Sequence, residues 1–189
     1  MSMGKIYKGL FPVVWIAFAL YWFISALTVK KARQSESPLA RLGYLALVYC
    51  TVALAVAPGL QHRYFAWTSP QETGVRFFIG AAMLLAGLGF AVWARIHLGQ
   101  YWSGRVQLKE GHQLIRSGPY QLVRHPIYTG ILTGFQGTSV AVGGSRSLIA
   151  FGVLVLLFLF KSRREECLMI QAFGDEYRQY RNFRRQQVK

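Results

Sequence analysis

Acidic residues and cysteines are what this chain has least of. Only 7 of its 189 residues are Asp or Glu, against 22 Lys or Arg, which gives a formal net charge of +15. The two cysteines, Cys50 and Cys167, are too few for a disulfide scaffold and lack the spacing of metal ligands. The four histidines are scattered, and the motifs GxGxxG, P-loop and HExxH are absent. We therefore expect no metal site, no disulfide framework and no soluble nucleotide-binding domain.

Long stretches of the chain also lack charge. Gly9–Val29, Leu42–Gln61 and Phe77–Ala94 contain no Asp, Glu, Lys or Arg, and 53% of all residues are hydrophobic. A membrane-crossing helix needs about 20 mostly apolar residues, because the hydrocarbon core is about 30 Å thick. Each of these three runs predicts one span. The first resembles a signal peptide in its flanking lysines, but its apolar run is longer than usual, which favours a retained helix.

A fourth apolar region, Ile127–Phe160, contains one charged residue, Arg146. It is too long for one span, and the turn signal at Gly143-Gly144-Ser145 divides it. We expect a helical hairpin made of Ile127–Val142 and Leu148–Phe160. The predicted fold is therefore an all-α, polytopic membrane protein of about five transmembrane helices, with spans 4 and 5 as the hairpin and a cytoplasmic C-terminal helix.

The distribution of positive charge predicts the orientation of these spans. If five spans are assumed, 17 of the 22 Lys and Arg lie on one side of the membrane. Cytoplasmic segments carry such an excess, so we expect the N-terminus outside and the C-terminus and active site in the cytoplasm. The charge then reflects topology and attraction to anionic lipid, and no nucleic-acid partner is expected. Residues 1–189 form a single integral-membrane domain, in which 9–61 are scaffold spans and 77–183 the catalytic and cofactor-binding region.

Polar residues concentrate in two segments that adjoin predicted span ends, 96–125 and the tail after Phe160. His125 precedes Pro126, which suits the first turn of a helix, so His125 should lie at a helix N-terminus whose free N–H groups favour an anion. Tyr128 would lie one turn or less inside. The alternative is that His125 and Tyr128 merely anchor the helix at the membrane interface.

The tail begins with two adjacent carboxylates, Glu165 and Glu166, close to the end of the last apolar run. Carboxylates in such a place need partners, which are either the neighbouring Arg163 and Arg164 or a ligand. If the tail is one helix, a single face carries one of these acids and an apolar stripe. That face consists of Glu166, Ile170, Phe173, Tyr177 and Tyr180.

Several short motifs in these segments resemble one family of integral-membrane enzymes. They are LGQYWSGRVQ, GHQLIRSGPY, RHPIY, and EE followed by FGDEYRQY, and they extend from about Trp93 to Tyr180. Their order and spacing resemble the isoprenylcysteine carboxyl methyltransferase family. Phospholipid N-methyltransferases and small-thiol methyltransferases share the RHPxY and EE pattern, and membrane sterol reductases share it more loosely. The first two spans carry no such resemblance.

The resemblance implies that S-adenosylmethionine is the cofactor, bound without a dinucleotide-binding fold. The adenosine and methionine parts would lie against residues that match the family's cofactor positions: Gln107, His112, Gln113, Leu114, Ile115, Tyr120, His125, Pro126, Ile127, Tyr128 and Glu165. Lys161 and Arg164 would face the substrate, and Glu165, Glu166 and His125 are the catalytic candidates. Where the family has an arginine, this chain has Lys161, which keeps the charge but loses the bidentate fork for a carboxylate.

The predicted reaction is an in-line transfer of a methyl group to a lipid or another lipophilic small molecule. The first choice of acceptor is the carboxylate of an isoprenylcysteine-like substrate, which needs no base. A phospholipid amine or a small thiol would have to lose a proton, with Glu166 or His125 as the base. An NADPH-dependent membrane reductase and a non-enzymatic lipid-binding protein are the other classes. The oligomeric state is left open, because Gly80, Gly87 and Gly89 suit packing within one chain or between chains.

Overall fold

The computed structural model describes residues 3–26, 74–99, 114–142 and 145–187. The second expected span, Leu42–Gln61, and the expected cofactor residues Gln107, His112 and Gln113 lie outside this part of the chain. Every regular element in the described residues is a helix, so the all-α prediction is confirmed there. The helices are α1 (Met3–Ala26), α3 (Gly74–Leu98), α4 (Pro119–Leu122), α5 (Pro126–Val142), α6 (Ser145–Phe173) and α7 (Asp175–Gln187).

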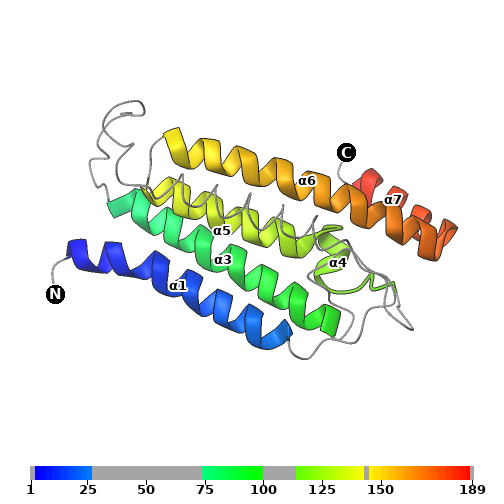
Figure 1. The fold of residues 1–189 in the computed structure, drawn as a ribbon, viewed down its shortest axis with the longest axis horizontal. Coiled ribbons are helices and arrows are strands. Elements are labelled where there is room, and N and C mark those ends of the chain that lie inside the picture. The colour runs from blue at the N-terminus through cyan, green and yellow to red at the C-terminus, as the bar shows by residue number, and fades with distance from the viewer. Residues whose placement is uncertain (1–2, 27–73, 100–113, 143–144, 188–189) are drawn as a thin grey trace, which may run out of the picture.

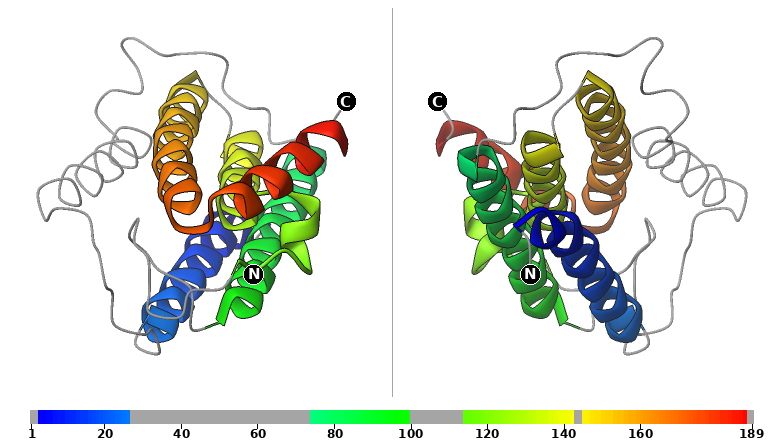
Figure 2. Two further views of the ribbon diagram at one scale, coloured as in Figure 1. Left: turned by 90° about the vertical axis from the view of Figure 1, so that its right-hand side faces the viewer. Right: turned by 90° about the vertical axis from the view of Figure 1, so that its left-hand side faces the viewer.

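The four long helices lie side by side (Figure 1). Helices α1, α3 and α6 run in one direction along the bundle and α5 runs in the other. The last turns of α1, α3 and α6 therefore lie at the same end as the first turn of α5, together with α4 and α7. We call this the site end. The view along the bundle shows α7 lying across it (Figure 2, left).

Glycines bring the backbones of α3 and α5 into close contact. A Cβ atom added to Gly87 would lie 2.5 Å from the Gly134 nitrogen and 2.6 Å from the Gly130 oxygen. A Cβ at Gly130 would likewise lie 2.5 Å from the Gly87 oxygen. Small residues allow helices to approach this closely and to gain dispersion contacts along the backbone. Gly80 and Gly87 are thus used within the chain, whereas a Cβ at Gly89 would meet no atom within 4 Å.

Apolar side chains remain exposed along the bundle. Among the described residues, α3 is the one helix that is long and apolar enough to cross a membrane by length and composition, with a hydropathy of 2.1. The shorter apolar stretch Gly9–Ser25 lies within α1. Large apolar residues of three helices face outward: Val13, Ile16, Leu20, Phe23 and Ile24 of α1, Val75, Phe78, Ile79, Leu85, Trp93 and Ile96 of α3, and Leu148, Ile149, Leu156, Leu159 and Phe160 of α6. The count of five spans stays a prediction.

The hairpin arm expected to end at Phe160 continues without a break to Phe173 as α6. Gly174 ends this helix in the left-handed region (φ +52°), where glycine is the residue least strained, and its N–H donates to the Ile170 oxygen at 2.9 Å. Glu165 and Glu166 therefore belong to a long rigid helix. The expectation of one continuous face through Tyr180 is wrong, because the chain turns at Gly174 before α7 begins.

Candidate functional site at the start of α5

The first turn of α5 forms the floor of the site. Pro126 is fully buried and occupies the first helical position, where a missing N–H costs nothing. The His125 carbonyl accepts the Thr129 N–H at 3.0 Å, so His125 stands at the helix start as predicted. This first turn lies at the positive end of the α5 helix dipole, which favours negative charge here.

Glu166 supplies one of the negative charges at this helix start. Its Oε1 lies 2.5 Å from an Arg124 guanidinium nitrogen and 3.3 Å from His125 Nε2. Arg163 and Arg164, the partners considered from the sequence, are exposed on α6 itself. The ion pair that anchors Glu166 thus comes from Arg124, a residue to which the sequence analysis assigned no role.

Glu165 supplies the second negative charge. The Tyr128 hydroxyl donates a hydrogen bond to Glu165 Oε1, and Glu165 Oε2 lies 3.6 Å from His125 Nδ1. The two ring nitrogens of His125 therefore face different carboxylates. The side chains of His125, Glu165 and Glu166 are only 22%, 22% and 18% exposed, so water screens this cluster weakly.

Aromatic rings and one lysine surround Tyr128. The His125 ring lies nearly parallel to it, with centroids 5.7 Å apart, and the Phe158 ring stacks on it at 4.7 Å. The Lys161 ammonium lies 5.4 Å from the Tyr128 centroid, within the range of cation–π attraction. Phe158 was missed by the sequence analysis. The available signal was its position two helical turns before Glu165, which places both on one face of α6.

The protonation states follow from these contacts. Burial by itself lowers the pKa of His125, but hydrogen bonds and charge from Glu165 and Glu166 outweigh it and raise this pKa above 6.5. Burial by itself raises the pKa of Glu166, but the His125 hydrogen bond and the charges of Arg124 and Arg181 lower it below 4.5. The two acidic side chains therefore favour the charged form of the His125 imidazole.

The raised pKa of His125 predicts a pH-dependent contribution to stability. That contribution is fully present below the unfolded pKa of 6.5 and is lost as the pH rises through the folded pKa. Replacing His125 by asparagine, which cannot carry charge, should therefore lower the thermal midpoint most near pH 6 and least near pH 9. Thermal unfolding of both proteins in detergent across this range measures the difference. A difference that grows with pH would contradict the ion-paired arrangement.

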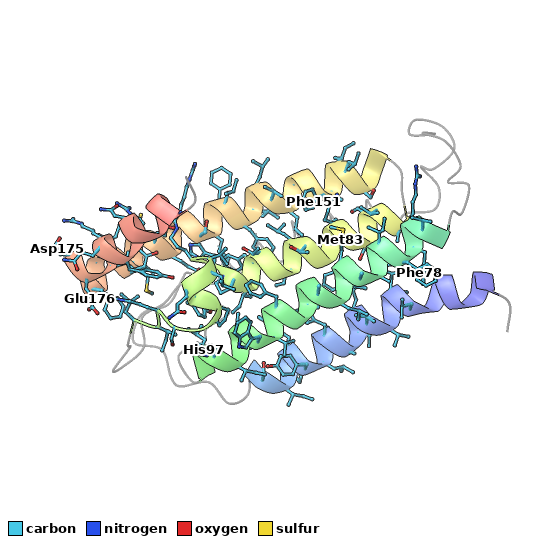
Figure 3. All side chains as sticks on the ribbon, turned by 180° about the vertical axis from the view of Figure 1, so that it is seen from behind. Phe78, Met83, His97, Phe151, Asp175 and Glu176 are labelled. Atoms are coloured by element: carbon cyan, nitrogen blue, oxygen red, sulfur yellow. The ribbon has the colours of Figure 1, made fainter. Side chains whose placement is uncertain are left out.

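Helix α7 covers the segment that leads into α5. The Tyr180 hydroxyl donates to the Tyr120 carbonyl at 2.6 Å, and Arg116 pairs with Glu176 at 2.5 Å. Tyr177 and Tyr180 are buried, while Asp175 and Glu176 point outward at this end (Figure 3). Burial, followed by the charge of Glu165, raises the pKa of the Tyr120 hydroxyl, which therefore stays neutral. No site role for the two α7 tyrosines was predicted from the sequence.

The residues directly before α4 also contact the last turn of α3. His97 Nε2 lies 2.7 Å from the Ser117 hydroxyl, and the His97 ring packs against Gly118. Gly118 has φ +60°, and an added Cβ would come within 2.8 Å of this ring. A side chain is therefore excluded there for both conformational and steric reasons.

The structure brings together most of the described residues that the sequence nominated. One cluster contains His125, Tyr128, Lys161, Glu165 and Glu166. The Tyr120 hydroxyl interacts electrostatically with Glu165 of this cluster. Of the other described residues predicted from the sequence, Pro126 and Ile127 are buried, Leu114 and Ile115 are half-buried, and Arg164 is exposed. Within the described ranges, no group of three or more His, Cys, Asp or Glu side chains has an arrangement that could hold a metal ion.

These observations describe a class of protein: a helical bundle with outward-facing apolar helices and a charged, aromatic-lined site at one end. Comparison with known families matches residues 79–171 to the isoprenylcysteine carboxyl methyltransferase family. A probable protein-S-isoprenylcysteine O-methyltransferase of Oryza sativa subsp. indica is 33% identical over 108 residues, which are 54% of this chain and 56% of that protein. The chain thus spans about half the length of this relative.

Two further relatives extend the comparison. Protein-S-isoprenylcysteine O-methyltransferase B of Arabidopsis thaliana is 30% identical over 161 residues, 83% of this chain and 73% of that protein. Methanethiol S-methyltransferase 1 of Bradyrhizobium diazoefficiens is 38% identical over 63 residues, 33% of this chain and 21% of that protein. The chain belongs to the isoprenylcysteine carboxyl methyltransferase family, which confirms the resemblance drawn from its motifs.

Proposed function

We propose that this protein is an integral-membrane methyltransferase that moves a methyl group from S-adenosylmethionine to the carboxylate of an isoprenylcysteine-like lipid. The observation that carries the proposal is the cluster of His125, Tyr128, Glu165 and Glu166, in which the imidazole and the tyrosine hydroxyl pair with the two carboxylates. Membership of the family supports methyl transfer over the NADPH-dependent reductase and over a lipid-binding protein without activity.

The residues of the cluster fit the charges of S-adenosylmethionine. Its carboxylate suits the positive end of the α5 helix dipole, and its ammonium suits the Glu165 carboxylate. Its sulfonium would suit the face of an aromatic ring, for which Tyr120 and Tyr128 are the candidates. When bound, the cofactor supplies an electrophilic methyl group, which the acceptor oxygen takes as the carbon–sulfur bond breaks to leave a neutral thioether and a methyl ester.

The protonation states of the site favour a carboxylate acceptor. An amine or a thiol must lose a proton, which requires a base with a pKa near the working pH. Hydrogen bonds and charge from Glu165 and Glu166 raise the pKa of His125, which favours its protonated form, and the partners of Glu166 lower the pKa of that carboxyl. A carboxylate needs no base, and Lys161 offers a cation close to Tyr128 that attracts it. The names of the rice and Arabidopsis relatives accord with this choice.

The work of the protein in such a reaction is to position the reactants and exclude water. Arg124 and His125 hold the two carboxylates of α6 against the start of α5. Tyr180 and the Arg116–Glu176 pair hold α7 over the approach from the aqueous side. Holding the nucleophile in line with the methyl group removes an entropic barrier, and a dry site favours the loss of charge in the transfer.

A membrane location supports access by a lipid substrate. The outward-facing apolar side chains of α1, α3 and α6 would be costly in water over so large an area and favourable in lipid. The proposal includes five spans, an external N-terminus and a cytoplasmic site, in keeping with the 17 cations on one side. S-adenosylmethionine would then enter from the cytoplasm and the prenyl chain from the bilayer.

The test is a binding measurement followed by a methyl-transfer assay on the purified protein in detergent. We expect S-adenosylhomocysteine to bind in calorimetry, and radiolabel from S-adenosylmethionine to appear in a farnesylcysteine analogue as an alkali-labile methyl ester. Methanethiol and phosphatidylethanolamine are assayed alongside. Absence of S-adenosylhomocysteine binding would overturn the proposed cofactor, and labelling confined to the thiol or the amine would overturn the proposed acceptor.

A further inference from the structure

A buried arginine joins the last turns of α1 and α3. Arg95 is only 3% exposed, although it carries a full charge. One of its terminal nitrogens donates to the Ser25 carbonyl at 2.5 Å and the other donates to the Gly99 carbonyl at 2.8 Å. Ser25 lies one residue before the end of α1, and Gly99 directly follows α3. The contact therefore pins α1 to the point where the chain leaves α3 toward the site.

The physical chemistry of helix ends explains why an arginine is used here. The last carbonyls of a helix have no partner within it, and the dipole makes this end negative. A guanidinium with donors in a rigid fork satisfies carbonyls of two helix ends at once, and a buried cation is tolerated only with such partners. Lysine has no such fork and cannot reproduce both contacts with the same geometry.

The same end of α1 also packs behind the site. Trp22 of α1 contacts the small cluster formed by Ala94 and Ile127, and Tyr120 and Tyr128 pack against that cluster as well. Trp22 lies one turn before Ser25 on α1. The end of α1 therefore packs against the same cluster as Tyr120 and Tyr128, the two aromatic residues next to Glu165.

We infer that Arg95 is a positioning residue for the methyl-donor site, and that the end of α1 forms its rear wall through Arg95 and Trp22. Helix α1, which was predicted from the sequence to be a scaffold span, then forms part of the methyl-donor site. The inference rests on the proposed function, because the pocket it supports is the one assigned to S-adenosylmethionine. We expect Arg95 to affect the affinity for the methyl donor, through Tyr120 and Tyr128, and not the affinity for the lipid acceptor.

The experiment compares Arg95→Met, Arg95→Lys and the control Arg76→Met, an exposed arginine at the far end of the same helix. Calorimetry with S-adenosylhomocysteine is run on protein that elutes as a single species in detergent. We expect the Kd to rise about tenfold for Arg95→Met, since lost charged hydrogen bonds typically cost an order of magnitude in an equilibrium. Arg95→Lys should be intermediate and Arg76→Met unchanged. The KM for the donor should rise while the KM for farnesylcysteine stays within about twofold.

The outcomes distinguish failure of the proposed function from failure of the inference about Arg95. If the unaltered protein does not bind S-adenosylhomocysteine, the proposed function fails. If it binds and folded Arg95→Met binds equally well, or if only the bound stoichiometry falls with Kd unchanged, Arg95 serves stability alone and the inference is overturned. Should Arg95→Met not yield folded protein, Arg95→Lys and Trp22→Leu decide by the same measurement. Unchanged donor affinity in both would overturn the inference.

Discussion

Replacing Glu165 by glutamine should reduce methyl transfer about a hundredfold or more and weaken S-adenosylhomocysteine binding by a similar factor. Glutamine preserves the shape of the side chain but removes the charge that faces the His125 imidazolium and accepts from the Tyr128 hydroxyl. It also removes the charge proposed to hold the cofactor ammonium. A hydrogen bond to a charged group contributes about 1.5–3 kcal/mol, so loss of the ammonium contact alone corresponds to about one to two orders of magnitude, and the weakened hold on His125 adds to it. Calorimetry and the radiolabel assay measure both effects.

Asp175→Asn is the matched control for this experiment. Its carboxylate is 83% exposed and pairs with Arg178 at 3.1 Å within the same helix, an interaction typically worth less than about 1 kcal/mol. We expect this variant to bind and react like the unaltered protein. If Glu165→Gln kept full affinity and activity while folding normally, Glu165 would not hold the methyl donor, and its contacts with Tyr128 and His125 would be structural only.

Replacing Gly87 by alanine should destabilise the protein strongly, whereas Gly89→Ala on the same helix should not. The new Cβ at Gly87 would lie 2.5 Å and 2.6 Å from backbone atoms of Gly134 and Gly130, and backbone cannot rotate aside as a side chain can. Helices α3 and α5 would have to separate, and overpacking of this kind costs about 1–3 kcal/mol or more. At Gly89 the Cβ meets open space, and alanine is favoured over glycine within a helix by about 0.5–1 kcal/mol.

The two alanine variants are therefore expected to change stability in opposite directions. Thermal unfolding followed by tryptophan fluorescence in detergent should show a lower midpoint for Gly87→Ala and an equal or higher midpoint for Gly89→Ala. Gly130→Ala tests the same contact from α5 and should resemble Gly87→Ala. Equal midpoints for Gly87→Ala and Gly89→Ala would show that these helices do not meet at their glycines.

Helix positions in the described residues followed closely from the local sequence. The charge-free run Phe77–Ala94 predicted α3, which extends from Gly74 to Leu98, and the proline after His125 predicted the start of α5. Hydropathy and proline geometry are properties of neighbouring residues, so a linear reading suffices for them. The end of α6 was predicted wrongly, because the charged residues after Phe160 mark the end of the apolar run and not the end of the helix.

The pairing of charges within the site could be predicted only in part. The RHPIY and EE motifs predicted that His125 and Glu165 lie in one site. In the structure, His125 Nδ1 lies 3.6 Å from Glu165 Oε2. The anchoring of Glu166 by Arg124 was not visible, because Arg163 and Arg164 are nearer in sequence and have the same charge. Proximity in the folded chain depends on how α6 lies against α5, which no local pattern encodes.

The sequence alone established the helical class, the segregation of cations from apolar runs, and the family, because composition, periodicity and ordered motifs are readable without a fold. The folded arrangement settled two further questions. It assigned Gly80 and Gly87 to a contact with α5 inside the chain, and it joined α1 to α3 through Arg95 and to the cluster beside Tyr120 and Tyr128 through Trp22. Both are contacts between surfaces far apart in sequence. The structural role of a small residue or a buried arginine depends on what packs against it, which the local sequence does not specify.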